Sequence, residues 1–212
     1  ACDDGDNNNH RMYVLSNGCN DPLTVYKNLG IITDPTNKWA IDGTILHHAS
    51  GRYIIWSGWE GDENVEQNIY IAKLKSPCEI EGERVMISRP EYDWEKLGGT
   101  GTPDGSPFIN EGPFVFNEQG RTFVAYSGAG SWCEDYGVAN LELCGEDPMD
   151  VTEKKKWEKP VLSKNDNFIG MGHASFIEED KTIFFHAWRA HEKNIVWNTV
   201  YPICAKYRLD GN

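Results

Sequence analysis

An aspartate, a glutamate and a histidine stand at the start of three similar segments of this chain. Asp42 leads an Asp-Gly-Thr-Ile run, Glu111 leads a Glu-Gly-Pro-Phe run and His173 leads a His-Ala-Ser-Phe run. A carboxylic acid that lies near a second carboxylate can be held protonated close to neutral pH and can then donate its proton. These residue types predict acid–base chemistry if the fold brings the three segments together, although an acid before glycine at a strand start is more often a turn residue.

The three segments share more than their first residue. Each continues through a short turn into a second apolar strand, which begins at Gly51, Gly120 or Lys181, and the pattern recurs at roughly sixty residues. Repetition of this kind is typical of β-propeller blades, whose innermost strands all begin around one central channel. In such a fold the three leading side chains each occupy the first position of a unit and face a common axis.

Strand signals are frequent along the chain and helix signals are few. Short apolar or alternating runs bounded by turns such as Glu118-Gln119-Gly120 predict strands. The expected strands are Arg11–Leu15, Trp39–His48, Tyr53–Trp59, Asn68–Leu74, Val85–Ser88, Gly112–Phe116, Thr122–Ser127, Gly137–Leu143, Ala174–Ile177, Thr182–Ala187 and Thr199–Tyr207. Asp150–Trp157 is interpreted as a loop with at most one helical turn. The chain is therefore predicted to be all-β.

Length and charge limit the classes of function. A chain of 212 residues that is 39% apolar is expected to form one domain, residues 1–212, with residues 1–10 as an acidic tail. The net charge of −13 argues against nucleic acid or an anionic membrane as a partner, because both require a basic surface. No run reaches the apolar length of a membrane span, and the polar first residues suit a secreted chain whose signal peptide has been removed.

The chain contains six cysteines, which match no metal-binding spacing. In an oxidising compartment they are expected to form three disulfides, with Cys133 and Cys144 as the first pair because they flank an expected hairpin. The alternative is a set of buried free thiols in a cytosolic protein.

Six motifs within residues 10–210 carry a resemblance to a known family. They are Arg11–Leu15, Lys38–Thr44, Gln67–Ala72, Ile87–Glu95, Asn110–Pro113 and Gly172–Phe176. Together they resemble glycoside hydrolase family 43, and most closely its α-L-arabinofuranosidase and exo-arabinanase members. The Ser-Arg-Pro-Glu-Tyr-Asp-Trp-Glu run and the following Asn-Glu-Gly-Pro are the most specific of them.

The resemblance implies a five-bladed β-propeller, of which this chain would hold about three and a half blades of antiparallel sheet. It also implies hydrolysis with inversion, by two carboxylates that a third assists. Position by position, Glu111 matches the general acid, Asp42 the carboxylate that orients this acid and raises its pKa, and His173 the axial histidine of the channel. His173 is expected to hydrogen-bond in the channel, or to hold water around a calcium ion as in some relatives. No cofactor or direct metal ligand is expected.

The sequence departs from the family at the catalytic base. The family places this base in its first blade, as an aspartate in an Asp-Pro segment near the N-terminus, and no equivalent segment is found here. Asp21-Pro22 falls in a turn after Arg11–Leu15 and is not assigned this role. The chain is therefore expected to keep the acid and to lack the base.

Several aromatic residues are candidate platforms for sugar rings. Trp132 and Tyr136 lie in a Ser131–Tyr136 segment interpreted as a loop at the channel mouth, and Trp56 and Trp59 end an expected strand. Aromatic rings pack on the faces of sugars, although aromatic residues also fill the hydrophobic cores of propeller blades. Trp132, Tyr136, Trp59 and His173 are taken as the substrate-binding candidates. Arg89 is expected in a structural ion pair between blades, and Glu95 has no assigned role.

Two classes of function remain. The first is a secreted arabinofuranose-releasing hydrolase, or part of one, that acts on an arabinose-containing glycan. The second is a non-catalytic protein that binds glycan or assembles through open propeller edges. Either way, unpaired edges and apolar faces predict another chain, or further copies of this one, as a partner.

Overall fold

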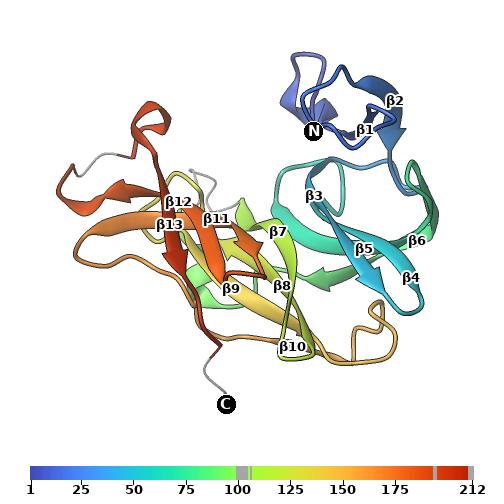
Figure 1. Ribbon diagram of the computed structural model, residues 1–212. Coiled ribbons are helices and arrows are strands. Elements are labelled where there is room, and N and C mark those ends of the chain that lie inside the picture. The colour runs from blue at the N-terminus through green and yellow to red at the C-terminus, as the bar shows by residue number, and fades with distance from the viewer. Residues whose placement is uncertain (99–104, 106, 193–194, 210–212) are drawn as a thin grey trace.

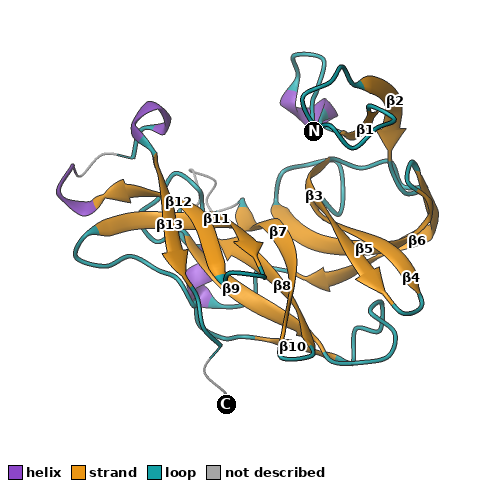
Figure 2. Cartoon of the chain, viewed as in Figure 1, coloured by secondary structure: helices purple, strands orange, loops and turns teal. Residues whose placement is uncertain are grey.

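The computed structural model describes residues 1–98, 105, 107–192 and 195–209. These residues form thirteen β-strands and four short 3-10 helices, so the predicted all-β class is confirmed (Figures 1 and 2). Within this described part no helix is long and apolar enough to cross a membrane.

The strands follow one another along the chain as a hairpin and three antiparallel meanders. The hairpin pairs β1 (Met12–Ser16) with β2 (Lys27–Ile32). The first meander contains β3 (Ala40–His48), β4 (Gly51–Gly58), β5 (Glu66–Ser76) and β6 (Glu79–Ser88). The second contains β7 (Phe108–Glu118), β8 (Arg121–Gly128), β9 (Gly137–Leu143) and β10 (Lys154–Lys156), and the third contains β11 (Phe168–Ile177), β12 (Thr182–Arg189) and β13 (Tyr201–Lys206). The 3-10 helices are η1 (Asn7–Asn9), η2 (Asp93–Lys96), η3 (Ala190–Glu192) and η4 (Trp197–Thr199).

Every strand predicted from the sequence is present, and β2 and β10 are additional. The interpretation of Asp150–Trp157 as a loop with a helical turn is wrong, because β10 lies within it. β10 consists of three lysines and has no apolar signal, and it forms by pairing with the end of β9. β2 contains Asn28 and Gly30, which weaken a strand pattern, and it forms by pairing with β1 across an irregular register.

A short parallel pairing of β5 with β7 joins the first and second meanders into one eight-stranded sheet. Apolar clusters fill the spaces between the hairpin and the successive meanders. One lies between the hairpin and the first meander, a second between the first and second meanders, and a third between the second and third meanders. In that order they include Met12 with Trp56, Ile71 with Val124, and Phe123 with Phe185. The described sheets form no closed ring, so the number of blades stays a prediction.

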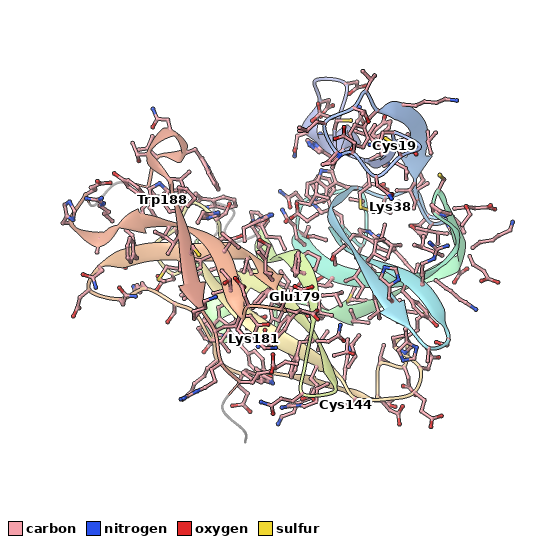
Figure 3. The ribbon with its side chains drawn as sticks, viewed as in Figure 1. Cys19, Lys38, Cys144, Glu179, Lys181 and Trp188 are labelled. Atoms are coloured by element: carbon pink, nitrogen blue, oxygen red, sulfur yellow. The ribbon has the colours of Figure 1, made fainter. Side chains whose placement is uncertain are left out.

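The predicted disulfides are wrong, because all six cysteines lie in the described part of the chain and all are free. Cys133 precedes β9, and Cys144, which is labelled in Figure 3, directly follows it. A strand of this length separates its two ends by about 20 Å, since each residue adds about 3.3 Å. A disulfide requires Cα atoms within about 7 Å of each other. The expected hairpin is a single strand, and this explains the error.

The packing between the first and second meanders can be tested at Ile71, which is fully buried on β5. We expect Ile71→Ala to lower the free energy of unfolding by about 2–5 kcal/mol, because truncation leaves a cavity. Ile177→Ala makes the same change at an exposed position of β11 and should alter stability by less than about 0.5 kcal/mol. Equal losses in chemical denaturation would contradict the assigned interface.

Candidate active site

The first strand of each meander carries the same irregularity near its start. The pairing register shifts between Ile41 and Thr44 in β3, between Glu111 and Phe114 in β7, and between Gly172 and Ser175 in β11. The first residue inside each bulge has a left-handed backbone. These residues are Asp42 with φ 58°, Gly112 with φ 56° and His173 with φ 54°. A bulge of this kind re-aims a side chain at the rim of a sheet.

The bulges correct the predicted alignment of the three units. Asp42 and His173 are structurally equivalent, but their counterpart in the second meander is Gly112 and not Glu111. Glu111 precedes that position by one residue. The three predicted residues therefore do not share one position, although the fold does bring them together.

Asp42 reaches from the first meander to the backbone of the second. Its Oδ2 atom accepts a hydrogen bond of 3.0 Å from the Gly112 amide. The contact joins the two sheets directly beside Glu111. It places a carboxylate next to the candidate acid.

Glu111 is almost fully buried, with 8% of its surface exposed. Its Oε1 atom accepts a hydrogen bond of 2.7 Å from the Tyr136 hydroxyl. Burial and the neighbouring Asp42 charge raise the pKa of Glu111 to about 7, although the Tyr136 hydrogen bond opposes part of this rise. A carboxyl group with this pKa can donate a proton near neutral pH.

His173 completes the cluster from the third meander. Its amide donates a hydrogen bond of 2.8 Å to Ser127 Oγ, and its Nε2 atom lies 3.9 Å from Asp42 Oδ1. The imidazole lies close to Gly112, where an added Cβ atom would come within 3.0 Å of the ring. Asp42, Glu111 and His173 thus lie in one cluster formed by the first strands of the three meanders.

Tyr136, predicted as a sugar platform, has a different setting. Its side chain is fully buried and its ring stacks on His186 with centroids 5.4 Å apart. The ring occupies space left by Gly172, because a Cβ atom there would lie 2.0 Å from it. Burial raises the pKa of Tyr136 well above its ordinary value, so the hydroxyl remains a donor to Glu111.

The two predicted tryptophans differ in exposure. Trp59 is buried and stacks on Trp39 with centroids 4.8 Å apart, so its ring offers no open face. Trp132 is 38% exposed, and its indole donates a hydrogen bond of 2.5 Å to the Gly98 carbonyl. Of these two candidates, Trp132 presents a surface that a sugar ring can contact.

His186 and Trp197 are residues near the site that the sequence analysis missed. His186 connects Tyr136 to the rings of Trp188 (Figure 3) and the exposed Trp197, with centroids 5.1 and 5.4 Å away. Burial, with a smaller effect of His173, lowers the pKa of His186 to about 4, so the ring is neutral at neutral pH. A histidine within an apolar strand was the available signal for His186, whereas Trp197 lies in a segment without any repeat signal.

The described residues do not fit a directly coordinated metal. They contain no group of three or more His, Cys, Asp or Glu side chains that could hold a metal ion. Calcium takes about six to eight oxygen ligands. Asp42 Oδ1 lies 3.9 Å from His173 Nε2, and Asp42 Oδ2 accepts a hydrogen bond from the Gly112 amide. A calcium ion held through water near His173 stays a prediction.

The raised pKa of Glu111 predicts a specific dependence of stability on pH. The Glu111 carboxyl group has a pKa of about 7 in the folded protein and about 4.5 in the unfolded chain, so the folded state binds its proton more tightly. The free energy of unfolding should therefore fall as the pH rises from about 4.5 to about 7. The loss from this group is on the order of 3 kcal/mol. Glu111→Gln should remove it, and denaturation of both proteins at several pH values measures the difference. Parallel pH profiles of the two proteins would contradict the raised pKa.

The chain matches known proteins of one family in its sequence. The family description "Glycosyl hydrolases family 43" matches residues 1–202. The chain is 27% identical over 187 residues to an extracellular exo-α-(1→5)-L-arabinofuranosidase of Streptomyces chartreusis, a match that covers 84% of this chain and 54% of that protein. It is 30% identical over 175 residues to a protein of the same name from Streptomyces avermitilis, with coverage of 80% and 34%.

The fold leads to the same family. A crystal structure of an α-L-arabinofuranosidase from Lactobacillus brevis matches with a TM-score of 0.77 and 27% identity, covering 95% of this chain and 64% of that one. The chain spans about half the length of the Streptomyces chartreusis relative. Because the family description covers nearly all of its residues, this chain belongs to glycoside hydrolase family 43.

Proposed function

We propose that this chain carries the acid side of an arabinofuranose-releasing active site, with Glu111 as the general acid and Asp42 as the carboxylate that orients it. The observation that carries the proposal is the buried Glu111 carboxyl group, whose pKa of about 7 keeps a large share of it protonated near neutral pH. Asp42 supports this state through its charge and fixes the adjacent Gly112 amide.

Cleavage of a glycosidic bond requires that the leaving oxygen be protonated. Glu111 would pass its proton to this oxygen as the bond to the anomeric carbon breaks. With inversion, water attacks the opposite face of the sugar and gives a proton to a second carboxylate, about 6.5–9.5 Å from the acid. The proposal assigns this general base to no residue of the chain.

The proposed substrate is an arabinose-containing polysaccharide outside the cell. Its support lies in the names of the relatives, two of which are extracellular exo-α-(1→5)-L-arabinofuranosidases. The exposed ring of Trp132 offers a stacking surface for a sugar. A neutral glycan also needs no basic surface, which agrees with the net charge of −13.

We expect this chain alone to hydrolyse aryl α-L-arabinofuranosides at a rate at least about 10²-fold below that of a complete family 43 arabinofuranosidase, because a general base contributes about 10²–10⁴-fold. Release of the aryl group measures the rate, and Glu111→Gln is the matched variant. Rapid turnover that is lost in this variant would show that the chain contains its own base.

The choice of substrate is tested by binding, which does not depend on turnover. Calorimetric titration should detect α-1,5-arabinobiose, whereas xylobiose serves as the matched control and should bind more weakly. Trp132→Ala should weaken the binding of arabinobiose. Equal binding of both sugars, or binding of neither, would contradict the proposed substrate.

A second candidate function, self-assembly or glycan binding without catalysis, is favoured by one surface. The hairpin exposes Tyr13 and Leu15 on β1 and Leu29 and Ile31 on β2, and Val25 in the intervening turn is 92% exposed. Contiguous apolar patches of this kind often mark interfaces. We propose that this face contacts another chain or a second copy of this one.

Light scattering tests the association. We expect the purified chain to form oligomers, and Leu15→Thr with Ile31→Thr should shift them toward a 24.0 kDa monomer. Val151→Thr changes an exposed apolar residue outside the hairpin and should leave association unchanged. A monodisperse monomer of the unaltered chain would exclude association between copies through this face.

A further inference from the structure

A second carboxylate is buried close to the strand that carries the acid. Glu95, in η2, is fully buried. Its Oε2 atom accepts hydrogen bonds from the Glu91 and Tyr92 amides at 2.7 and 2.8 Å. Its Oε1 atom accepts hydrogen bonds from Asn110 Nδ2 and the Tyr126 hydroxyl, both at 2.9 Å. The acid–base scheme proposed above makes no use of this group.

Lys156 balances the charge of Glu95. Its Nζ atom lies 2.8 Å from Glu95 Oε1 and also donates to the Arg89 carbonyl. The neighbouring Lys154 donates to the Ile87 carbonyl at 2.6 Å. These lysines lie on β10 of the second meander, whereas Ile87 is the penultimate residue of β6 in the first and Arg89 directly follows that strand. The short strand β10 therefore links the second meander to the first.

Asn110 connects this network to the acid. It is fully buried and directly precedes Glu111. Besides its bond to Glu95, its Oδ1 atom accepts from Ser88 Oγ at 2.8 Å, and its backbone carbonyl accepts from Ser57 Oγ at 3.0 Å. Gly112, on the other side of Glu111, is held by Asp42. The residues on both sides of the acid are thus fixed by groups of the first meander.

We propose that Glu95 and Lys156 are positioning residues for Glu111, which hold its strand in place through the Asn110 side chain. The consequence for catalysis rests on the proposed function, but the positional role does not. The Glu95 and Lys156 pair is itself held by several hydrogen bonds. It therefore fixes both the position and the orientation of the Asn110 side chain, whereas an apolar contact would fix only its distance. The pair then sets how deeply the Glu111 carboxyl group is buried.

The test measures the pKa of Glu111 by NMR titration of its side-chain carboxyl carbon, with Glu111→Gln to identify the signal. In Glu95→Gln combined with Lys156→Met, which removes both charges of the pair, we expect this pKa to fall from about 7 by about one unit, because the carboxyl group becomes more exposed. The groups around Glu111, namely Asp42, Tyr136, His173 and His186, are unaltered. Ser88→Ala removes only one bond to Asn110 and should give a smaller shift in the same direction.

The matched control is the Arg121 and Glu142 ion pair, which joins β8 and β9 of the same meander by two hydrogen bonds of 2.6 Å. Arg121→Met with Glu142→Gln should lower stability without moving the pKa of Glu111. An unchanged pKa of Glu111 in the folded double variant would overturn the proposal, as would an equal shift in the control. If the double variant does not fold, an unchanged pKa in Ser88→Ala would overturn it. The readout requires neither turnover nor sugar, so a failure of the arabinofuranosidase proposal leaves this test intact.

Discussion

The hydrogen bond from the Gly112 amide to the Asp42 carboxylate is the contact on which the arrangement of the site depends. It requires a left-handed bulge in β3, so that Asp42 turns toward the second meander, and a second bulge in β7, so that the Gly112 amide faces it. It also requires that the two sheets stay in register through the apolar cluster between them. The hydrogen bond beside the acid therefore forms only when the two bulges and the packing between the two meanders are all in place.

A repeated serine contact fixes the spacing of the sheets near this point. Ser57 pairs with Ile41 across the first meander and donates to the Asn110 carbonyl of the second. Ser127 pairs with Glu111 and accepts from the His173 amide of the third. The equivalent position in the third meander holds His186, whose Nε2 atom has no partner among the described residues. In the first two meanders the residue at this position, Ser57 or Ser127, bonds to the next meander. In the third meander the residue is His186, and its ring stacks on Tyr136.

The sequence was sufficient for the strands with regular apolar alternation and for the convergence of Asp42, Glu111 and His173. It was not sufficient where long-range pairing creates a strand, as in the lysines of β10, or where one residue shifts the register, as at Gly112. Burial of Tyr136 could not be read from the loop that carries it, because the space for its ring is provided by Gly172, a distant residue. Arg89 does form an ion pair, with Glu66 at 2.8 Å, but both residues belong to the first meander, so the pair does not join two blades as expected.

Gly172 has a further consequence for how sequences of this family can be interpreted. It carries no functional group, yet the Tyr136 ring fills the volume that any side chain at this position would take. A single methyl group there would displace the phenol from Glu111 and change the proton affinity of the acid while every carboxylate remained in place. A survey of family members that counted only acidic residues would classify such a sequence as intact. In any member that places a tyrosine beside its acid in this way, the volume at the equivalent glycine is a separate criterion for whether the protonation state of the acid is controlled.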